Sequence, residues 1–246
     1  MASMFFFDAT NRSGADDYRR AVHDSNGLQM LTGRGEELWR PLANPRTLQI
    51  SSFADTSPRG FGLMQRAREL RAFEDLEARY ERRPSLWIEP IGDWGEGVVQ
   101  LVEIPTKAEI HDNIVAYWRP KQPLQAKGEH NFTYRMHWGA GSFVRSDLAR
   151  FTESRSGAGR LPGMRLFVLD VAGERLLGLA PDAKPRVAAS VDRGRIENAV
   201  VQPNPEGGWR IAFELLPEDN KSAELRVQLL LGDTPLSETW IYRWTA

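Results

Sequence analysis

The chain of 246 residues is long enough for one large β domain or two domains of ordinary size, with a well-buried core. Its 41% hydrophobic and 26% charged content is typical of a globular protein, and a net charge of −1 provides no general field to attract nucleic acid or an anionic membrane. The absence of cysteine excludes disulfides, thiolate catalysis and zinc–thiolate sites. No run approaches the ~20 apolar residues that a membrane span requires.

The first half of the chain is predicted to consist of short strands separated by turns. Apolar and alternating runs predict strands at residues 3–9, 28–31, 37–40, 47–53, 60–65, 85–90, 97–104 and 114–118. Asn26 and Gly27 tolerate a positive φ and predict a tight hairpin turn. Residues 66–83 form a charged stretch in which Leu70, Phe73 and Tyr80 recur at helical spacing, so this stretch is predicted to be helical or irregular and solvated.

The composition changes after residue 118 and predicts a domain boundary. Residues 121–128 are polar and read as a linker between a domain at 1–120 and a second domain at 129–246. Seven short strands are expected in the second domain, at residues 131–138, 165–171, 186–192, 196–201, 209–215, 224–231 and 238–244. This number and spacing predict an immunoglobulin-like β-sandwich, with residues 143–163 as a long loop.

The chemistry that the residues indicate is carboxylate chemistry. Glu109 and Asp112 stand directly before an aromatic strand, where a rigid frame would hold them, although spacing alone favours the plainer interpretation that both are loop acids that cap a turn. The four histidines are scattered, and no nucleotide-binding or nucleophile motif occurs, so no metal and no cofactor are expected.

Paired carboxylates beside many aromatic residues suit glycoside hydrolysis, which needs one acid and one base. The candidates at strand ends are Asp24, Glu109 and Asp112. Further acids in the first half of the chain are Asp55, Asp75, Glu89, Asp93 and Glu96. Residue patterns alone do not choose among them.

Several runs resemble the periplasmic glucan biosynthesis proteins of the G and D type. They are residues 21–27 (AVHDSNG), 38–42 (LWRPL), 51–55 (SSFAD), 60–66 (GFGLMQR), 83–90 (RPSLWIEP), 112–118 (DNIVAYW) and 236–240 (LSETW). The resemblance implies an all-β chain: the C-terminal part of a large mutarotase-like β-sandwich, followed by an immunoglobulin-like β-sandwich. It also implies a periplasmic role in making osmoregulated glucans.

The resemblance extends to function and to individual residues. Family members are similar to inverting endo-β-1,2-glucanases, so the expected partner is β-1,2-glucan. The acid of the family's site corresponds to Asp112 and the base to Asp24, while Glu109, Tyr80 and His23 correspond to positions that support the site or bind substrate.

One departure from the family pattern bears on activity. Family members are longer and carry a signal peptide, whereas this chain starts partway through the large sandwich. We therefore expect a fragment, or a chain whose sheet is completed by a homodimer partner or by a complementing N-terminal half. The alternatives to hydrolysis are a non-catalytic glucan-binding or assembly component, or an inactive fragment.

Overall fold

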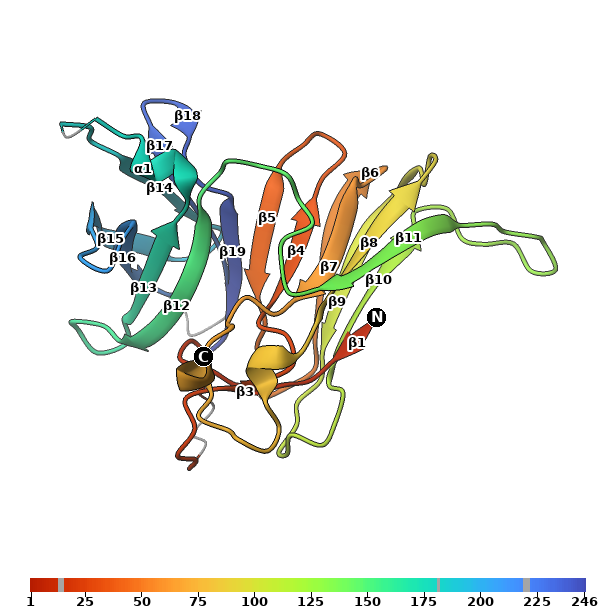
Figure 1. The fold of residues 1–246 in the computed structure, drawn as a ribbon, viewed down its shortest axis with the longest axis horizontal. Coiled ribbons are helices and arrows are strands. Elements are labelled where there is room, and N and C mark those ends of the chain that lie inside the picture. The colour runs from red at the N-terminus through yellow and green to blue at the C-terminus, as the bar shows by residue number, and fades with distance from the viewer. Residues whose placement is uncertain (13–15, 181, 219–221) are drawn as a thin grey trace. The chain divides into compact units, whose positions relative to one another are not determined.

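The computed structural model describes residues 1–12, 16–180, 182–218 and 222–246 (Figure 1). The chain forms two compact units. The first comprises Met1–Asp8, Arg12–Leu38 and Leu42–Val144, and the second comprises Ala9–Asn11, Trp39–Pro41 and Arg145–Ala246. The described residues form several antiparallel sheets and very little helix. The predicted all-β class is therefore confirmed. None of the described helices is long and apolar enough to cross a bilayer.

The first unit contains two four-stranded arrays and one small two-stranded sheet (Figure 1). One array has the order β1 (Ala2–Ser3), β10 (Ile114–Pro120), β9 (Glu96–Glu103) and β6 (Gln49–Thr56). The other has the order β11 (Thr133–Gly139), β8 (Ser85–Ile91), β7 (Gly60–Met64) and β4 (Gly27–Leu31). The small sheet pairs β2 (Phe5–Phe7) with β3 (Val22–His23).

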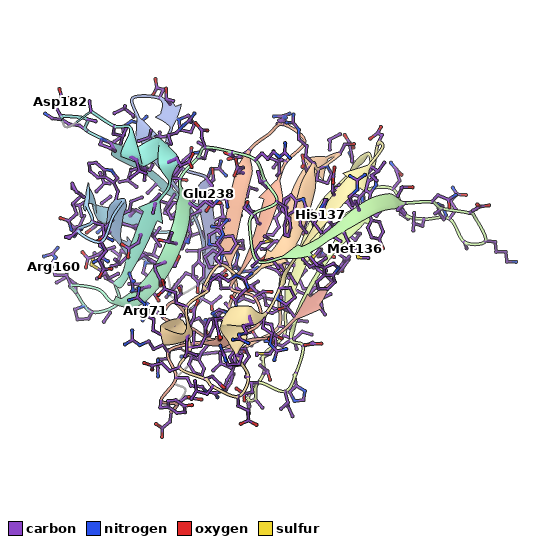
Figure 2. All side chains as sticks on the ribbon, viewed as in Figure 1. Arg71, Met136, His137, Arg160, Asp182 and Glu238 are labelled. Atoms are coloured by element: carbon purple, nitrogen blue, oxygen red, sulfur yellow. The ribbon has the colours of Figure 1, made fainter. Side chains whose placement is uncertain are left out.

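Side-chain alternation explains why these runs form strands. On β9, Val99 and Leu101 are fully buried and the flanking Val98 and Val102 are partly exposed, while the buried Gln100 accepts a 2.6 Å hydrogen bond from the Tyr117 hydroxyl on β10. On β11, Met136 and His137 (labelled in Figure 2) are successive residues on opposite faces, and the His137 ring lies 2.7 Å from a Glu89 carboxylate oxygen on β8. The alternating burial follows the period-two pattern of the sequence.

The charged stretch at residues 66–83 contains no α-helix. It holds two single turns of 3₁₀ helix, η1 (Leu70–Ala72) and η2 (Tyr80–Arg82). Glu74 and Arg79 adopt positive φ angles of 61° and 51°, which break the helical path between the two turns. Phe73 and Tyr80 nevertheless face the core, where they pack with Met4, Phe7, Ala21 and Val22.

The second unit contains two arrays of strands around an aromatic core. One sheet has the order β12 (Arg150–Ala158), β13 (Arg165–Ala172), β16 (Trp209–Leu216) and β15 (Arg195–Pro203). In the other, β17 (Ala223–Leu231) pairs with β14 (Arg186–Val191), β18 (Thr234–Pro235) and β19 (Thr239–Trp244). The ring of Phe167 on β13 lies 6.0 Å from that of Trp240 on β19, centroid to centroid, so the two arrays pack face to face.

Two smaller features complete the secondary structure. Strand β5 (Glu37–Pro41) runs across the division between the two units, and α1 (Glu174–Leu177) is a single α-helical turn in the second unit. Glu238 (Figure 2), just before β19, is fully buried and accepts a 2.9 Å hydrogen bond from the Phe151 amide. A buried carboxylate of this kind is structural because a backbone donor satisfies it.

Two local predictions are wrong. Residues 143–163 are not a long loop, because they contain β12, which pairs along its length with β13. Asn26 and Gly27 do not form a hairpin turn: neither has a positive φ, and Gly27 begins β4, which pairs with β7. The Asn26 amide donates instead to the Met64 carbonyl at 2.9 Å, so the pair links neighbouring strands.

The predicted linker at residues 121–128 lies within the first compact unit, which continues through β11 to Val144. The domain boundary at 121–128 stays a prediction, as do the mutarotase-like and immunoglobulin-like types of the two sandwiches.

Candidate functional site

A short stretch of backbone at Met4 and Phe5 brings two distant carboxylates together. The Asp24 amide donates to the Met4 carbonyl at 2.9 Å. The Phe5 amide donates to the side-chain oxygen of Asn113, also at 2.9 Å, and Asn113 is buried. Asp112 directly precedes Asn113, so Asp24 and Asp112 flank the same two residues although they are far apart in the sequence.

Asp24 is a half-buried carboxyl with one cationic partner. Its side chain is 30% exposed, and an oxygen lies 3.1 Å from Arg83 Nε. Burial raises the pKa of Asp24; the Arg83 charge opposes this change and the negative charge of Asp112 adds to it. The two carboxylates therefore interact electrostatically, and the single arginine does not compensate for burial and repulsion.

Glu109 and Tyr80 lie beside this pair. The Tyr80 side chain is buried, and its pKa is raised well above the usual range, first by burial and then by the negative charge of Glu109. Tyr80 also hydrogen-bonds Glu109, and Asp24 is near enough to add to the same effect. The Arg83 guanidinium lies over the Tyr80 ring, 5.7 Å from its centroid. Tyr80 thus stays a neutral hydroxyl donor at ordinary pH.

His23 lies in the core beneath Asp24. Its ring stacks on Phe5 at 5.5 Å and meets Phe73 edge-on at 4.9 Å. Burial lowers the pKa of His23 to about 3, so the ring is neutral at physiological pH. With only 2% of the residue exposed, His23 packs under the site rather than lining it.

The structure therefore brings four of the five predicted site residues together. Asp24 interacts with Asp112 and with Tyr80, and Tyr80 interacts with Glu109. Asp112 is exposed, as a group that meets a substrate must be. The fifth residue, His23, reaches the cluster through the backbone that it shares with Asp24. Whether these residues are catalytic stays a prediction.

Comparison with known proteins identifies the family. The family model described as "Periplasmic glucan biosynthesis protein, MdoG" matches residues 1–244. The chain belongs to this family. The family that the sequence runs indicated is thus confirmed.

Three curated relatives in the MdoG family are each about twice as long as this chain. A protein named "Glucans biosynthesis protein G" from Rhodopseudomonas palustris strain BisA53 is 60% identical over all of this chain and 48% of its own length. The protein of the same name from Bradyrhizobium diazoefficiens is 56% identical over the same shares. One from Shewanella sp. strain ANA-3 is 49% identical over 99% of this chain and 45% of its own length. The chain spans about half the length of the curated relatives that it matches.

Sequence reasoning missed three residues of this candidate site. Arg83 pairs with Asp24, Arg19 pairs with Glu109 at 2.8 Å, and Asn113 fixes the loop that carries Asp112. Arg83 and Asn113 occur inside runs that carry the family resemblance, which was an available signal. Arg19 lies in a polar loop with no pattern, so nothing local marked it.

A hollow of about 900 Å³ adjoins the cluster. Six of its ten lining residues are acidic and one is basic. They are Asp16, Asp17, Tyr18, Arg19, Glu74, Asp75, Leu76, Glu77, Ala78 and Glu109. Glu109 is the only one of the five predicted site residues among them. The hollow gives an uncharged, hydroxyl-rich ligand many hydrogen-bond acceptors and would repel an anion.

Metal binding has no support in the described ranges 1–12, 16–180, 182–218 and 222–246. No group of three or more His, Asp or Glu side chains there is arranged to hold an ion. The chemistry available to the cluster is proton transfer by carboxyl groups and hydrogen bonding by Tyr80.

Proposed function

We propose that this chain carries the carboxylate pair of an inverting endo-β-1,2-glucanase that acts in periplasmic glucan biosynthesis. The observation that supports this most directly is the pair of hydrogen bonds that places Asp24 and Asn113, the neighbour of Asp112, on Met4 and Phe5. Membership of the MdoG family and the names of the relatives supply the substrate class, a glucan. Periplasmic location is part of the proposal.

In the proposed reaction the two carboxyl groups have different tasks. Asp112, the exposed member, donates a proton to the glycosidic oxygen that leaves. Asp24 accepts a proton from the water that attacks the anomeric carbon, directly or through a hydroxyl relay. The neutral hydroxyl of Tyr80, held by Glu109, supplies a hydrogen bond beside this path.

The division of roles rests on the family resemblance. The raised pKa of Asp24 would suit a proton donor as well as a base that must be ionised. The opposing charge of Arg83 favours the ionised form that a base requires. The two assignments predict different kinetics for the same pair of substitutions.

The experiment compares Asp112→Asn and Asp24→Asn on two substrates. On linear β-1,2-glucan, each variant should lose about 1,000-fold in kcat, as expected for loss of a general acid or base. On a β-1,2-linked oligosaccharide with an activated aryl leaving group, Asp112→Asn should regain most of its rate because departure no longer needs a proton. Asp24→Asn should stay slow. The reverse pattern would exchange the roles, and full retention of glucan hydrolysis in Asp112→Asn would end the assignment.

The assay has to allow for the length of the chain. The purified chain is tested alone and together with the part of a relative that it does not match, because the relatives are about twice as long. Size-exclusion chromatography of each sample reports whether a homodimer or a complemented assembly is the active form.

A second candidate function is glucan binding or assembly without catalysis. It is favoured by aromatic side chains at the end of β11: the Trp94 ring lies 5.6 Å from Phe132 and 6.2 Å from Tyr134, and both partners are at least 40% exposed. Exposed aromatic faces stack on sugar rings. Calorimetry that detects β-1,2-glucan binding without any product would support this candidate, and weaker binding by Tyr134→Ala would locate it.

A further inference from the structure

We infer that Arg19 is a positioning residue that holds Glu109 against Tyr80 at the carboxylate site, an inference that rests on the proposed function. Arg19 lies outside the runs that indicated the site. Its guanidinium joins three loop segments that are distant in the sequence, and it is largely buried, with only 13% of the side chain exposed.

The geometry around Arg19 is specific. Nη1 lies 2.8 Å from an oxygen of Asp75 and 2.8 Å from an oxygen of Glu109. Nε and Nη2 donate to the two oxygens of Asp17, at 3.0 and 2.8 Å. This two-point contact fixes the plane of the guanidinium, so that Nη1 donates a hydrogen bond to Asp75 and lies within ion-pair distance of Glu109.

Asp17 and Asp75 each keep a backbone hydrogen bond when the guanidinium of Arg19 is removed. Asp75 is also held by the amides of Glu77 and Ala78, at 2.9 and 2.7 Å. Asp17 is held by the Arg19 amide at 2.9 Å. Glu109 is the most exposed of the three, with 37% of its side chain accessible, and it lies between β9 and β10 outside regular structure.

Removal of the guanidinium would therefore displace Glu109 before the other two acids. Asp75 and Glu109 both touch the same nitrogen of Arg19, so without that charge they would repel each other at short range. Asp75 cannot retreat without breaking two backbone hydrogen bonds. Glu109 can turn towards solvent, and it would then release the Tyr80 hydroxyl that lies near Asp24.

The test measures the state of Tyr80 as well as the rate. Protein labelled at the ring carbon that bears the tyrosine hydroxyl gives one NMR signal for each of its five tyrosines, and Tyr80→Phe assigns one of them. The Tyr80 signal should move in Arg19→Gln in the same direction as in Glu109→Gln. It should not move in Arg20→Gln, the matched control, because the Arg20 side chain is 70% exposed and lies 3.8 Å from Glu74.

Kinetics on β-1,2-glucan supply a double-mutant cycle. Arg19→Gln and Glu109→Gln should each lower kcat by up to about 100-fold, typical of a misplaced supporting group, with a smaller change in KM. The double variant should be no slower than the single ones, because both changes remove one unit. Rate losses that multiply, or an unmoved Tyr80 signal in Arg19→Gln, would overturn the inference.

A replacement variant and a readout that does not depend on activity complete the test. If Arg19→Gln does not fold, Arg19→Lys replaces it, because an ammonium cannot reproduce the two-point contact with Asp17. A wild-type Tyr80 signal in that variant would count against positioning. If the wild-type chain and its assemblies cleave no β-1,2-glucan, the proposed function fails, and the Tyr80 signal still decides whether Arg19 positions Glu109.

Discussion

Two carboxylates, the buried Asp170 in the second compact unit and the half-buried Asp24 in the first, have opposite electrostatic settings. Asp170 on β13 accepts hydrogen bonds from Arg210 at 2.6 and 2.8 Å and from Arg155 at 2.8 Å. Burial alone would raise the pKa of Asp170, but the two arginines outweigh it and the pKa is lowered. Asp24 has one arginine and a neighbouring carboxylate, and its pKa is raised.

The opposite pKa changes indicate different roles: Asp170 stabilises the fold, whereas Asp24 stays available for a ligand. Two arginines satisfy the charge of Asp170, so nothing further is required of solvent or substrate. Asp24 keeps a disfavoured charge at a partly open position, and such groups cluster at functional sites. His23, beside Asp24, carries the same signature because burial excludes its charged form.

The largest effect on stability should come from His23. Its folded pKa of about 3 lies below the ordinary value of 6.5, so between these pH values the unfolded chain binds the extra proton and stability falls as pH falls. This group alone contributes a slope of up to ~1.4 kcal/mol per pH unit. Urea unfolding from pH 7 to 4 should show a flatter dependence in His23→Phe. His130→Phe is the control for the loss of a histidine from an exposed position.

The next effect tests the paired carboxylate. Asp170→Asn leaves two arginines without their anion and should cost about 2 kcal/mol, the range for loss of hydrogen bonds to a charged group. For a protein of this size the melting temperature should fall by about 4–8 °C. Asp233→Asn is the matched control: its fully exposed carboxylate pairs with Arg186 at 3.1 Å and should be worth almost nothing. Equal losses in both variants would remove the basis of the comparison.

The smallest expected effect is a gain in stability, in the variant Asp24→Asn. The folded pKa of Asp24 lies above its ordinary value of 3.8, so its ionisation costs stability as pH rises through the folded pKa. Asp24→Asn should therefore raise the melting temperature at pH 7, by roughly 2 °C if the gain is near 1 kcal/mol. The gain should vanish below about pH 4, where both states of the wild type are protonated. A lower melting temperature at pH 7 would show that Asp24 is a structural group like Asp170.

Periodicity predicted most strands because it reports burial directly. The run from Ile114 to Trp118 is rich in β-branched and aromatic residues, and it forms β10 in register with β9. Strand β12 was not predicted because its sequence, RFTESRSGA, has a single large apolar residue, Phe151, and therefore no alternation of apolar and polar residues. Residues 66–83 were predicted to be either helical or irregular because Leu70, Phe73 and Tyr80 share helical spacing, whereas Glu74 and Arg79 take positive φ angles that spacing does not reveal.

The candidate site was only partly accessible to sequence reasoning. Local patterns marked Glu109 and Asp112 but could not pair them with Asp24, since the link runs through the backbone of Met4 and Phe5. The family resemblance supplied that pairing. Ion pairs between loops, such as Arg19 with Glu109, follow no period, and they become visible only when the folded chain places the loops together.

The hydrogen bond from the Phe5 amide to Asn113 also has a kinetic consequence. It joins residues 108 apart, so it can form only after a very long loop has closed. Asp112 reaches Asp24 through that same closure, which means that a partly folded chain cannot hold the pair. Recovery of the coupled carboxylates during refolding is therefore expected to lag behind strand formation. During refolding, a time course of the Tyr80 signal would follow the completion of the first unit. Far-ultraviolet circular dichroism would follow the earlier formation of strands.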